Sequence, residues 1–160
     1  MVFNANDPSG AGGLSADLTA MSSASAHVLS VVTGTYVRDT SEVHDHIAFD
    51  EEAVADQARA ALEDMPVQAF KLGVLGSVEN IAVIAEIISD YPHIPVIVDP
   101  VIASGRGDEL ASEAMLATLR ELIIPQATVI TPNTMEARRL VARSSDDFDE
   151  HSMSECAARL

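Results

Sequence analysis

The segment Asp7-Pro8-Ser9-Gly10-Ala11-Gly12-Gly13 joins a short apolar start, Val2 and Phe3, to a helix-like stretch that begins at Leu14. Its three glycines within four residues allow positive φ angles and let a ligand approach the backbone N–H groups closely. A strand, a glycine-rich turn and a helix in this order are typical of open α/β folds, which bind small ligands beyond the strand ends. The spacing matches neither the dinucleotide-binding nor the P-loop fingerprint. From the spacing alone, the segment is either a ligand-binding loop or a simple reversal of the chain.

Nearly continuous apolar runs indicate strands that are covered on both faces, as in a parallel sheet, at residues 28–33, 69–74, 96–99 and 128–131. Apolar residues at helical spacing predict helices between them, at residues 52–65, 78–91 and 111–122. Alternation of this kind predicts right-handed crossovers. We therefore expect an α/β fold, a doubly wound and mostly parallel sheet with helices on both faces. The polar segment 34–49 is expected to form a hairpin or a flap beside the site.

Composition limits the class of protein and its partners. The chain has 160 residues, of which 48% are apolar, so we expect a single globular domain over residues 1–160. No apolar run is long enough to span a bilayer and no leader opens the chain, which predicts a cytoplasmic protein. The net charge of −16 argues against binding to nucleic acid or to an anionic membrane. The lone Cys156 excludes an internal disulfide and a cysteine-based metal cage.

The end of the chain predicts an incomplete domain. Residues 150–160 form an amphipathic helical pattern with no strand after it. A doubly wound domain rarely ends on an unfinished crossover, so the chain is expected to be cut short. The acidic cluster before this helix, at residues 146–150, is expected to be a solvated loop rather than a metal site.

Polar residues that follow two of the predicted strands are candidates for the site. Asp99 ends the strand at 96–99, at the sheet edge where α/β proteins bind ligands. Asn133 and Glu136 have the spacing of a capping box at the start of a helix. A second interpretation, compatible with the first, is that Asp99 and Glu136 organise hydrated Mg²⁺, which takes one or two carboxylates and keeps several waters. Lys71, inside an apolar strand, either pairs with a charge or faces a ligand, or its ammonium extends to solvent at the strand start.

These segments, in this order, resemble the hydroxymethylpyrimidine/phosphomethylpyrimidine kinases of thiamine synthesis, in the ribokinase-like superfamily. The resemblance covers residues 3–142 and rests on six segments, at residues 7–17, 30–33, 71–73, 99–102, 107–108 and 131–137. It implies a kinase that uses ATP and Mg²⁺ to phosphorylate 4-amino-5-hydroxymethyl-2-methylpyrimidine and then its monophosphate. It also implies that the protein forms a homodimer.

The resemblance assigns roles to particular residues. The pyrimidine pocket would be formed by Ala5, Gly12, Asp17, Val37, Arg38, Val74 and Val101. Within it, Asp17 would hydrogen-bond the amino or hydroxyl group of the ring, and it is expected to face the same cleft as the glycines, about one helical turn away. Asn133 and Glu136 would hold phosphate and nucleotide, and Asp99 and Glu136 would hold the metal ion.

Arg38 departs from the family pattern, which usually has Gln or Glu at this position. An arginine only donates hydrogen bonds, so it cannot accept one from an amino group of the ring. It either favours a phosphorylated or carboxylated ligand or points away from the pocket. Two alternatives therefore remain open, a pyridoxal-type vitamin kinase and a non-catalytic pyrimidine-binding module.

The resemblance also implies that the catalytic segment is absent. The carboxyl-terminal third of the family carries a Gly-Thr-Gly anion hole, the catalytic residue that follows it and most of the nucleotide pocket, so no catalytic residue is assigned in this chain. Donors of an anion hole contribute about 100- to 1,000-fold to the rate. We therefore expect little or no kinase activity from the purified 160-residue chain, and full turnover by that chain would contradict the prediction.

Overall fold

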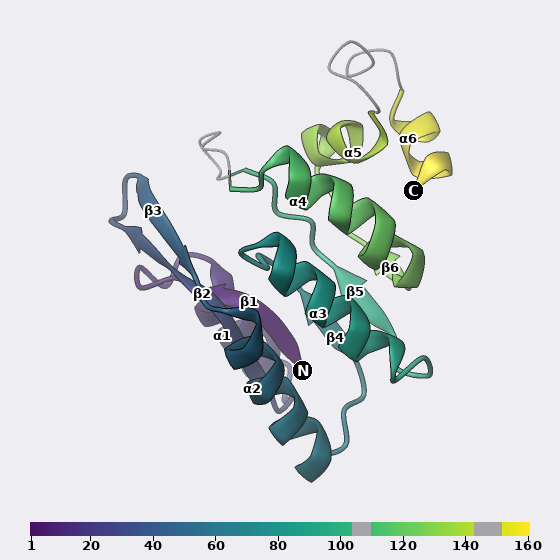
Figure 1. Cartoon of the computed structure of the whole chain (residues 1–160). Coiled ribbons are helices and arrows are strands. Elements are labelled where there is room, and N and C mark those ends of the chain that lie inside the picture. The colour runs from purple at the N-terminus through teal and green to yellow at the C-terminus, as the bar shows by residue number, and fades with distance from the viewer. Residues whose placement is uncertain (104–109, 143–151) are drawn as a thin grey trace.

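A computed structural model describes residues 1–103, 110–142 and 152–160 (Figure 1). In these residues six strands form one sheet with the order β3-β2-β1-β4-β5-β6. All neighbours are parallel except the antiparallel pair β2 and β3. The bounds are β1 Val2–Asn6, β2 Ser30–Arg38, β3 Val43–Ala48, β4 Phe70–Leu72, β5 Val96–Val98 and β6 Val129–Ile130. The predicted α/β class and mostly parallel sheet are confirmed.

Helices cover both faces of the sheet (Figure 1). Their bounds are α1 Gly13–Ser23, α2 Glu51–Asp64, α3 Val78–Ser89, α4 Glu113–Thr118, α5 Thr134–Val141 and α6 Met153–Arg159. Side-chain caps fix several of the helix starts, since Asp50, Ser77 and Ser112 each accept a hydrogen bond from a backbone N–H in the first turn. Helix α1 packs against β1 and β2.

The main core lies between the sheet and the helices α2, α3 and α4. Phe3, Phe70 and Leu72 are fully buried there, because parallel neighbours in register point to the same face. The residues between them in the strands, such as Lys71, point to the opposite face, which α1 partly covers. Polar side chains on that second face are therefore available to build a site.

Two predicted elements differ from the structure in their bounds. The strand expected at 28–33 runs from Ser30 to Arg38, because the antiparallel partner β3 extends the ladder beyond the parallel part. The segment 34–49 is accordingly a hairpin, one of the two forms predicted. The helix expected at 111–122 is α4 followed by a π-helical turn at Leu119–Ile123.

Some predictions lie outside the described residues. These are the family segment Gly107-Asp108 and the acidic cluster at 146–150. The described part of the terminal segment forms α6, which begins after Ser152 with a complete capping box. No helix in the described residues has both the length and the apolar character needed to cross a membrane.

Asn80 joins strand β2 to two loops, and its removal is expected to destabilise the fold. Its side-chain nitrogen donates to the carbonyl oxygens of Thr33, Phe49 and Leu75 at 3.3, 3.1 and 3.0 Å, and the residue is fully buried. Asn80→Ala removes the donor that these three oxygens share, and within the described residues only that of Thr33 keeps a further one, the backbone N–H of Phe49, so we expect a loss of about 2–4 kcal/mol. Urea denaturation measures the loss. The exposed change Glu86→Gln in the same helix is the control and should stay within about 0.5 kcal/mol of the parent; an equally small effect of Asn80→Ala would contradict this role.

Candidate functional site

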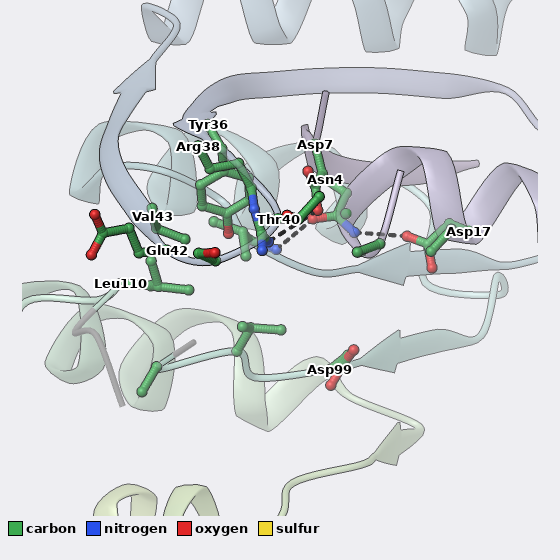
Figure 2. Close-up of a pocket in the computed structure, with 18 of the residues that line it drawn as sticks. Asn4, Asp7, Asp17, Tyr36, Arg38, Thr40, Glu42, Val43, Asp99 and Leu110 are labelled. Atoms are coloured by element: carbon green, nitrogen blue, oxygen red, sulfur yellow. Dashed lines mark hydrogen bonds and ion pairs between the residues drawn. The ribbon is translucent and has the colours of Figure 1, made fainter. Parts of the chain in front are cut away.

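A cleft of about 440 Å³ opens at the carboxyl ends of the parallel strands (Figure 2). It is lined by residues from the segment 7–13, the start of α1, the β2–β3 hairpin and the ends of β4 and β5. This is the edge where open α/β sheets place ligands. The volume is within the range of pockets that enclose small molecules.

The glycine-rich segment forms one wall of the cleft around a buried carboxylate. Asp7 is 1% exposed, and its Oδ1 accepts hydrogen bonds from the backbone N–H and hydroxyl of Ser9 at 2.9 and 2.7 Å. Gly10 and Gly13 have φ angles of 73° and 55°, which favour glycine. At Gly12 the absent side chain leaves space beside Asp7 Oδ2. The segment is therefore a structured wall that a ligand can approach closely.

Asn4 joins this wall to the first turns of α1. Its Oδ1 accepts from the backbone N–H groups of Ala5 and Val74, both at 2.9 Å, and its Nδ2 donates to Asp17 Oδ2 at 2.7 Å. Gly73 makes room for it, because a Cβ there would lie 2.6 Å from the Asn4 amide. Figure 2 shows Asp17 held by Asn4 at the edge of the cleft.

Lys71 is the second partner of Asp17. Its Nζ lies 2.9 Å from Asp17 Oδ2 and 3.7 Å from Asp99 Oδ2. Its side chain is 16% exposed. Of the two alternatives for this lysine, the structure therefore shows a paired ammonium in the cleft, not one that extends to solvent at a strand start.

The hairpin contributes hydrogen-bond donors to the opposite wall. Arg38 Nη1 donates to Asp7 Oδ2 at 3.2 Å (Figure 2). Its Nε donates to the carbonyl oxygen of Asp39. Arg38 thus lines the cleft and does not point away from it. Burial, together with the negative charge of Asp7, raises the pKa of Tyr36 to about 12. Its hydroxyl is therefore protonated near neutral pH and can donate.

His46 packs behind Tyr36 and is expected to make the fold sensitive to acid. The two rings lie 5.1 Å apart, and His46 Nε2 is buried with no hydrogen-bond partner in the described residues. Burial lowers the pKa of His46 below 6.5. The unfolded chain therefore binds a proton at His46 near pH 6.5, and the folded protein binds it only at lower pH. The contribution of neutral His46 to the unfolding free energy is therefore fully present above pH 6.5 and is lost as the pH falls below that value.

The pH dependence of unfolding tests this effect. Between pH 8 and pH 5, His46→Gln should lose less unfolding free energy than the parent protein, because the protonation difference has been removed. The exposed His27 is the control, and His27→Gln should keep the pH dependence of the parent. Identical pH profiles for the parent and His46→Gln would contradict the prediction.

The two carboxylates predicted to bind metal differ in their exposure and in their hydrogen bonds. Asp99 lines the cleft with a side chain that is 40% exposed. Glu136 is buried, and its oxygens accept from the backbone N–H groups of Asn133 and Ile102 at 2.8 and 3.4 Å. The predicted capping box is confirmed, because Asn133 Oδ1 also accepts from the N–H of Glu136. No group of three or more His, Cys, Asp or Glu side chains within the described ranges could hold a metal ion.

The structure brings most of the predicted pocket residues to one cleft, which is lined by Gly12, Asp17, Arg38, Val74, Val101 and Asp99. Ala5 lies behind the lining and packs with Tyr36 and Val74. Val37 is 43% exposed on the other face of the hairpin, because side chains alternate along a strand and its neighbours Tyr36 and Arg38 face the cleft. Asn133 and Glu136 are not among the lining residues.

Asn4 and Tyr36 line the cleft but are not among the predicted site residues. A polar residue within a buried apolar strand, such as Asn4, is a detectable signal, because burial of an amide without hydrogen bonds is costly. Tyr36 carries no comparable signal, since an aromatic residue is ordinary in a strand.

The sequence comparisons match kinases of phosphomethylpyrimidine. The sequence model of the family described as phosphomethylpyrimidine kinase matches residues 7–160. The chain is similar to hydroxymethylpyrimidine/phosphomethylpyrimidine kinases from Streptomyces coelicolor, at 35% identity over 89% of the chain, and from Escherichia coli, at 32% identity over 92%. It spans 52% and 57% of these two relatives, about half of their length.

Solved structures agree with the sequence comparisons. The fold is similar to a phosphomethylpyrimidine kinase from Clostridium difficile, with a TM-score of 0.81 and 30% identity over 93% of this chain and 66% of that one. It is also similar to a pyridoxal kinase from Staphylococcus aureus in complex with AMP-PCP and pyridoxal, with a TM-score of 0.77 and 25% identity over 98% of this chain and 55% of that one.

Proposed function

The chain belongs to the phosphomethylpyrimidine kinase family, and from that premise we propose that its cleft binds 4-amino-5-hydroxymethyl-2-methylpyrimidine and its monophosphate. The proposed activity of the protein is ATP-dependent phosphorylation of these compounds in thiamine biosynthesis. The observation that carries the proposal is the Asp17 carboxylate, which is fixed in the cleft by Asn4 and Lys71 next to the glycine-rich wall. A carboxylate held in this way can accept hydrogen bonds from the amino or hydroxymethyl group of the ring.

The other lining residues suit a flat, mostly apolar ring. Gly12, Val74 and Val101 offer surfaces without polar side chains, and Tyr36 and Arg38 offer donors to a ring nitrogen. Phosphoryl transfer needs positioning and charge neutralisation more than covalent chemistry from the protein. The role we assign to these residues is to orient the ring and its hydroxyl group.

ATP and Mg²⁺ are part of the proposal. Asp99 suits a hydrated Mg²⁺, because its carboxylate is exposed at a strand end and only Lys71 pairs with it among the described residues. Glu136 suits the metal less well, since its oxygens already accept from backbone N–H groups. We therefore assign Glu136 and Asn133 to shaping the start of α5, near the expected position of the nucleotide phosphates. When bound, Mg²⁺ supplies charge neutralisation for phosphate oxygens.

Pyridoxal is the second candidate ligand. The observation that favours it is Arg38, whose guanidinium donates but cannot accept, and which therefore suits the phenolate oxygen of a hydroxypyridine ring. The similarity to a pyridoxal kinase also supports this candidate.

Calorimetric titration of the 160-residue chain tests the proposal. We expect the aminopyrimidine to bind more tightly than pyridoxal and more tightly than the same pyrimidine without its hydroxymethyl group. Binding of pyridoxal but not of the aminopyrimidine would overturn the assignment in favour of the second candidate. A phosphorylation assay with ATP and Mg²⁺ on the chain extended by the carboxyl-terminal third of a relative separates a kinase from a non-catalytic pyrimidine-binding module, which binds the ring without turnover.

A homodimer is also proposed. The outer face of the hairpin exposes the apolar side chains Val37, Ile47 and Phe49, which a second copy could cover. Sedimentation of the parent protein and of Ile47→Glu tests this, since the charge on that face should shift a dimer toward monomer. A parent protein that is monomeric at high concentration would contradict it.

A further inference from the structure

Lys71 is the only lysine in a chain of net charge −16. It lies in β4 between Phe70 and Leu72, which are both fully buried, and its own side chain points into the cleft. An ammonium that is mostly removed from water costs free energy unless opposite charges pair with it. Solubility does not explain this position, because a lysine on the surface would increase solubility equally well.

The contacts of Lys71 fix one oxygen of Asp17 and leave the other available. Asp17 Oδ2 accepts from Lys71 Nζ at 2.9 Å and from Asn4 Nδ2 at 2.7 Å. Asp17 Oδ1 has no hydrogen-bond partner in the described residues. The Asp17 side chain is 17% exposed and lines the cleft.

We propose that Lys71 is a positioning residue for ligand binding. With Asn4 it holds Asp17 by Oδ2, so that Oδ1 is the oxygen presented to a hydroxyl or amino group of the ligand. The inference rests on the proposed function in one respect, that the ligand is a ring carrying such donors. Lys71 acts through Asp17 and need not touch the ligand.

Asp99 gives Lys71 a second effect on the same site. The Lys71 ammonium lies between Asp17 and Asp99, at 2.9 and 3.7 Å from their oxygens. Without it the two carboxylates face the same cleft with no cation between them, and their repulsion favours other rotamers of Asp17. The lysine therefore holds Asp17 in one orientation.

A double-mutant cycle on ligand affinity tests the proposal. Methionine matches the length of the lysine and suits an apolar strand, so Lys71→Met is the first variant. We expect it to weaken binding of 4-amino-5-hydroxymethyl-2-methylpyrimidine about 10-fold in calorimetry, and Lys71→Arg to restore part of the loss. In an Asp17→Asn background the same change should have no further effect, because Lys71 acts through the missing carboxylate.

The outcomes are distinguishable from failure of the proposed function. If the parent protein does not bind the pyrimidine, the proposed function and this inference both fall. If the parent binds it and Lys71→Met binds it equally well, or loses affinity by the same factor in both backgrounds, only the positioning role falls. Melting temperatures of all variants show whether a loss of affinity reflects a loss of folded protein.

The single lysine also provides a direct spectroscopic test. Lysine labelled with carbon-13 at Cε gives one side-chain resonance in this chain, which needs no assignment. We expect this resonance to shift in Asp17→Asn without ligand and to shift in the parent protein when the pyrimidine is added. A resonance that both changes leave unmoved would show that Lys71 is not coupled to Asp17 or to the ligand, and would overturn the proposal.

Discussion

Gly13→Ala is expected to destabilise the protein by about 3 kcal/mol or more and to abolish ligand binding. Gly13 has a φ of 55°, and a Cβ there would lie 2.5 Å from the carbonyl oxygen of Ala5 and 3.2 Å from the Asp7 side chain. The strained conformation costs about 1–3 kcal/mol by itself. The overlap with the Ala5 backbone adds to this cost, because neither β1 nor α1 can move without disturbing the core.

Gly10→Ala is the matched control for this change. Gly10 also has a positive φ, of 73°, but a Cβ there meets nothing within 4 Å. Gly10→Ala should therefore lower the unfolding free energy only by the strain of an alanine at positive φ, about 1 kcal/mol, and should leave ligand affinity nearly unchanged. Equal losses of unfolding free energy for the two variants, measured in urea, would show that the close packing of the segment against β1 is not important.

Asp17→Asn is expected to weaken binding of the aminopyrimidine by about 10- to 100-fold, while the protein remains folded. The carboxylate accepts from a neutral amide and from an ammonium, and its loss replaces a charged acceptor in the cleft by a neutral one. Titration calorimetry measures the affinity, and the melting temperature reports on the fold.

The control for Asp17→Asn is Asp56→Asn, which makes the same charge change on the exposed surface of α2. This variant should bind the pyrimidine like the parent. If Asp17→Asn lowers the melting temperature while leaving the affinity unchanged, Asp17 has a structural role and the proposed site is wrong.

The fold could be predicted from the sequence because its strands are buried on both faces. Residues 69–74 and 96–99 are nearly continuous in apolar side chains, and β4 and β5 lie inside these ranges. The bounds of β2 were wrong at both ends, since its outer half is stabilised by the antiparallel strand β3 and carries the polar pattern of a half-exposed strand. Pairing between strands is tertiary information that a local apolar pattern does not contain.

The site could be predicted only in part. The glycine segment and Asp17 are adjacent in the chain, so helical geometry is enough to predict that they share a cleft. The Asn4 side chain accepts from the backbone N–H of Val74 and packs against Gly73, which both lie some 70 residues away in the chain. No local sequence pattern reveals that contact. The direction of Arg38 depends on strand alternation within a hairpin whose register shifts after Val37, so its pairing with Asp7 needed the structure.

We propose that the ring of the substrate lies in the cleft between the glycine-rich segment and the β2–β3 hairpin. A crystal structure of the chain with 4-amino-5-hydroxymethyl-2-methylpyrimidine would show where the ring binds. We predict the ring next to Gly12, with its amino or hydroxyl group within hydrogen-bond distance of Asp17 Oδ1. Binding instead in the second cavity, of about 540 Å³ and lined by Met1, Met21, His27 and Met65, would contradict the claim.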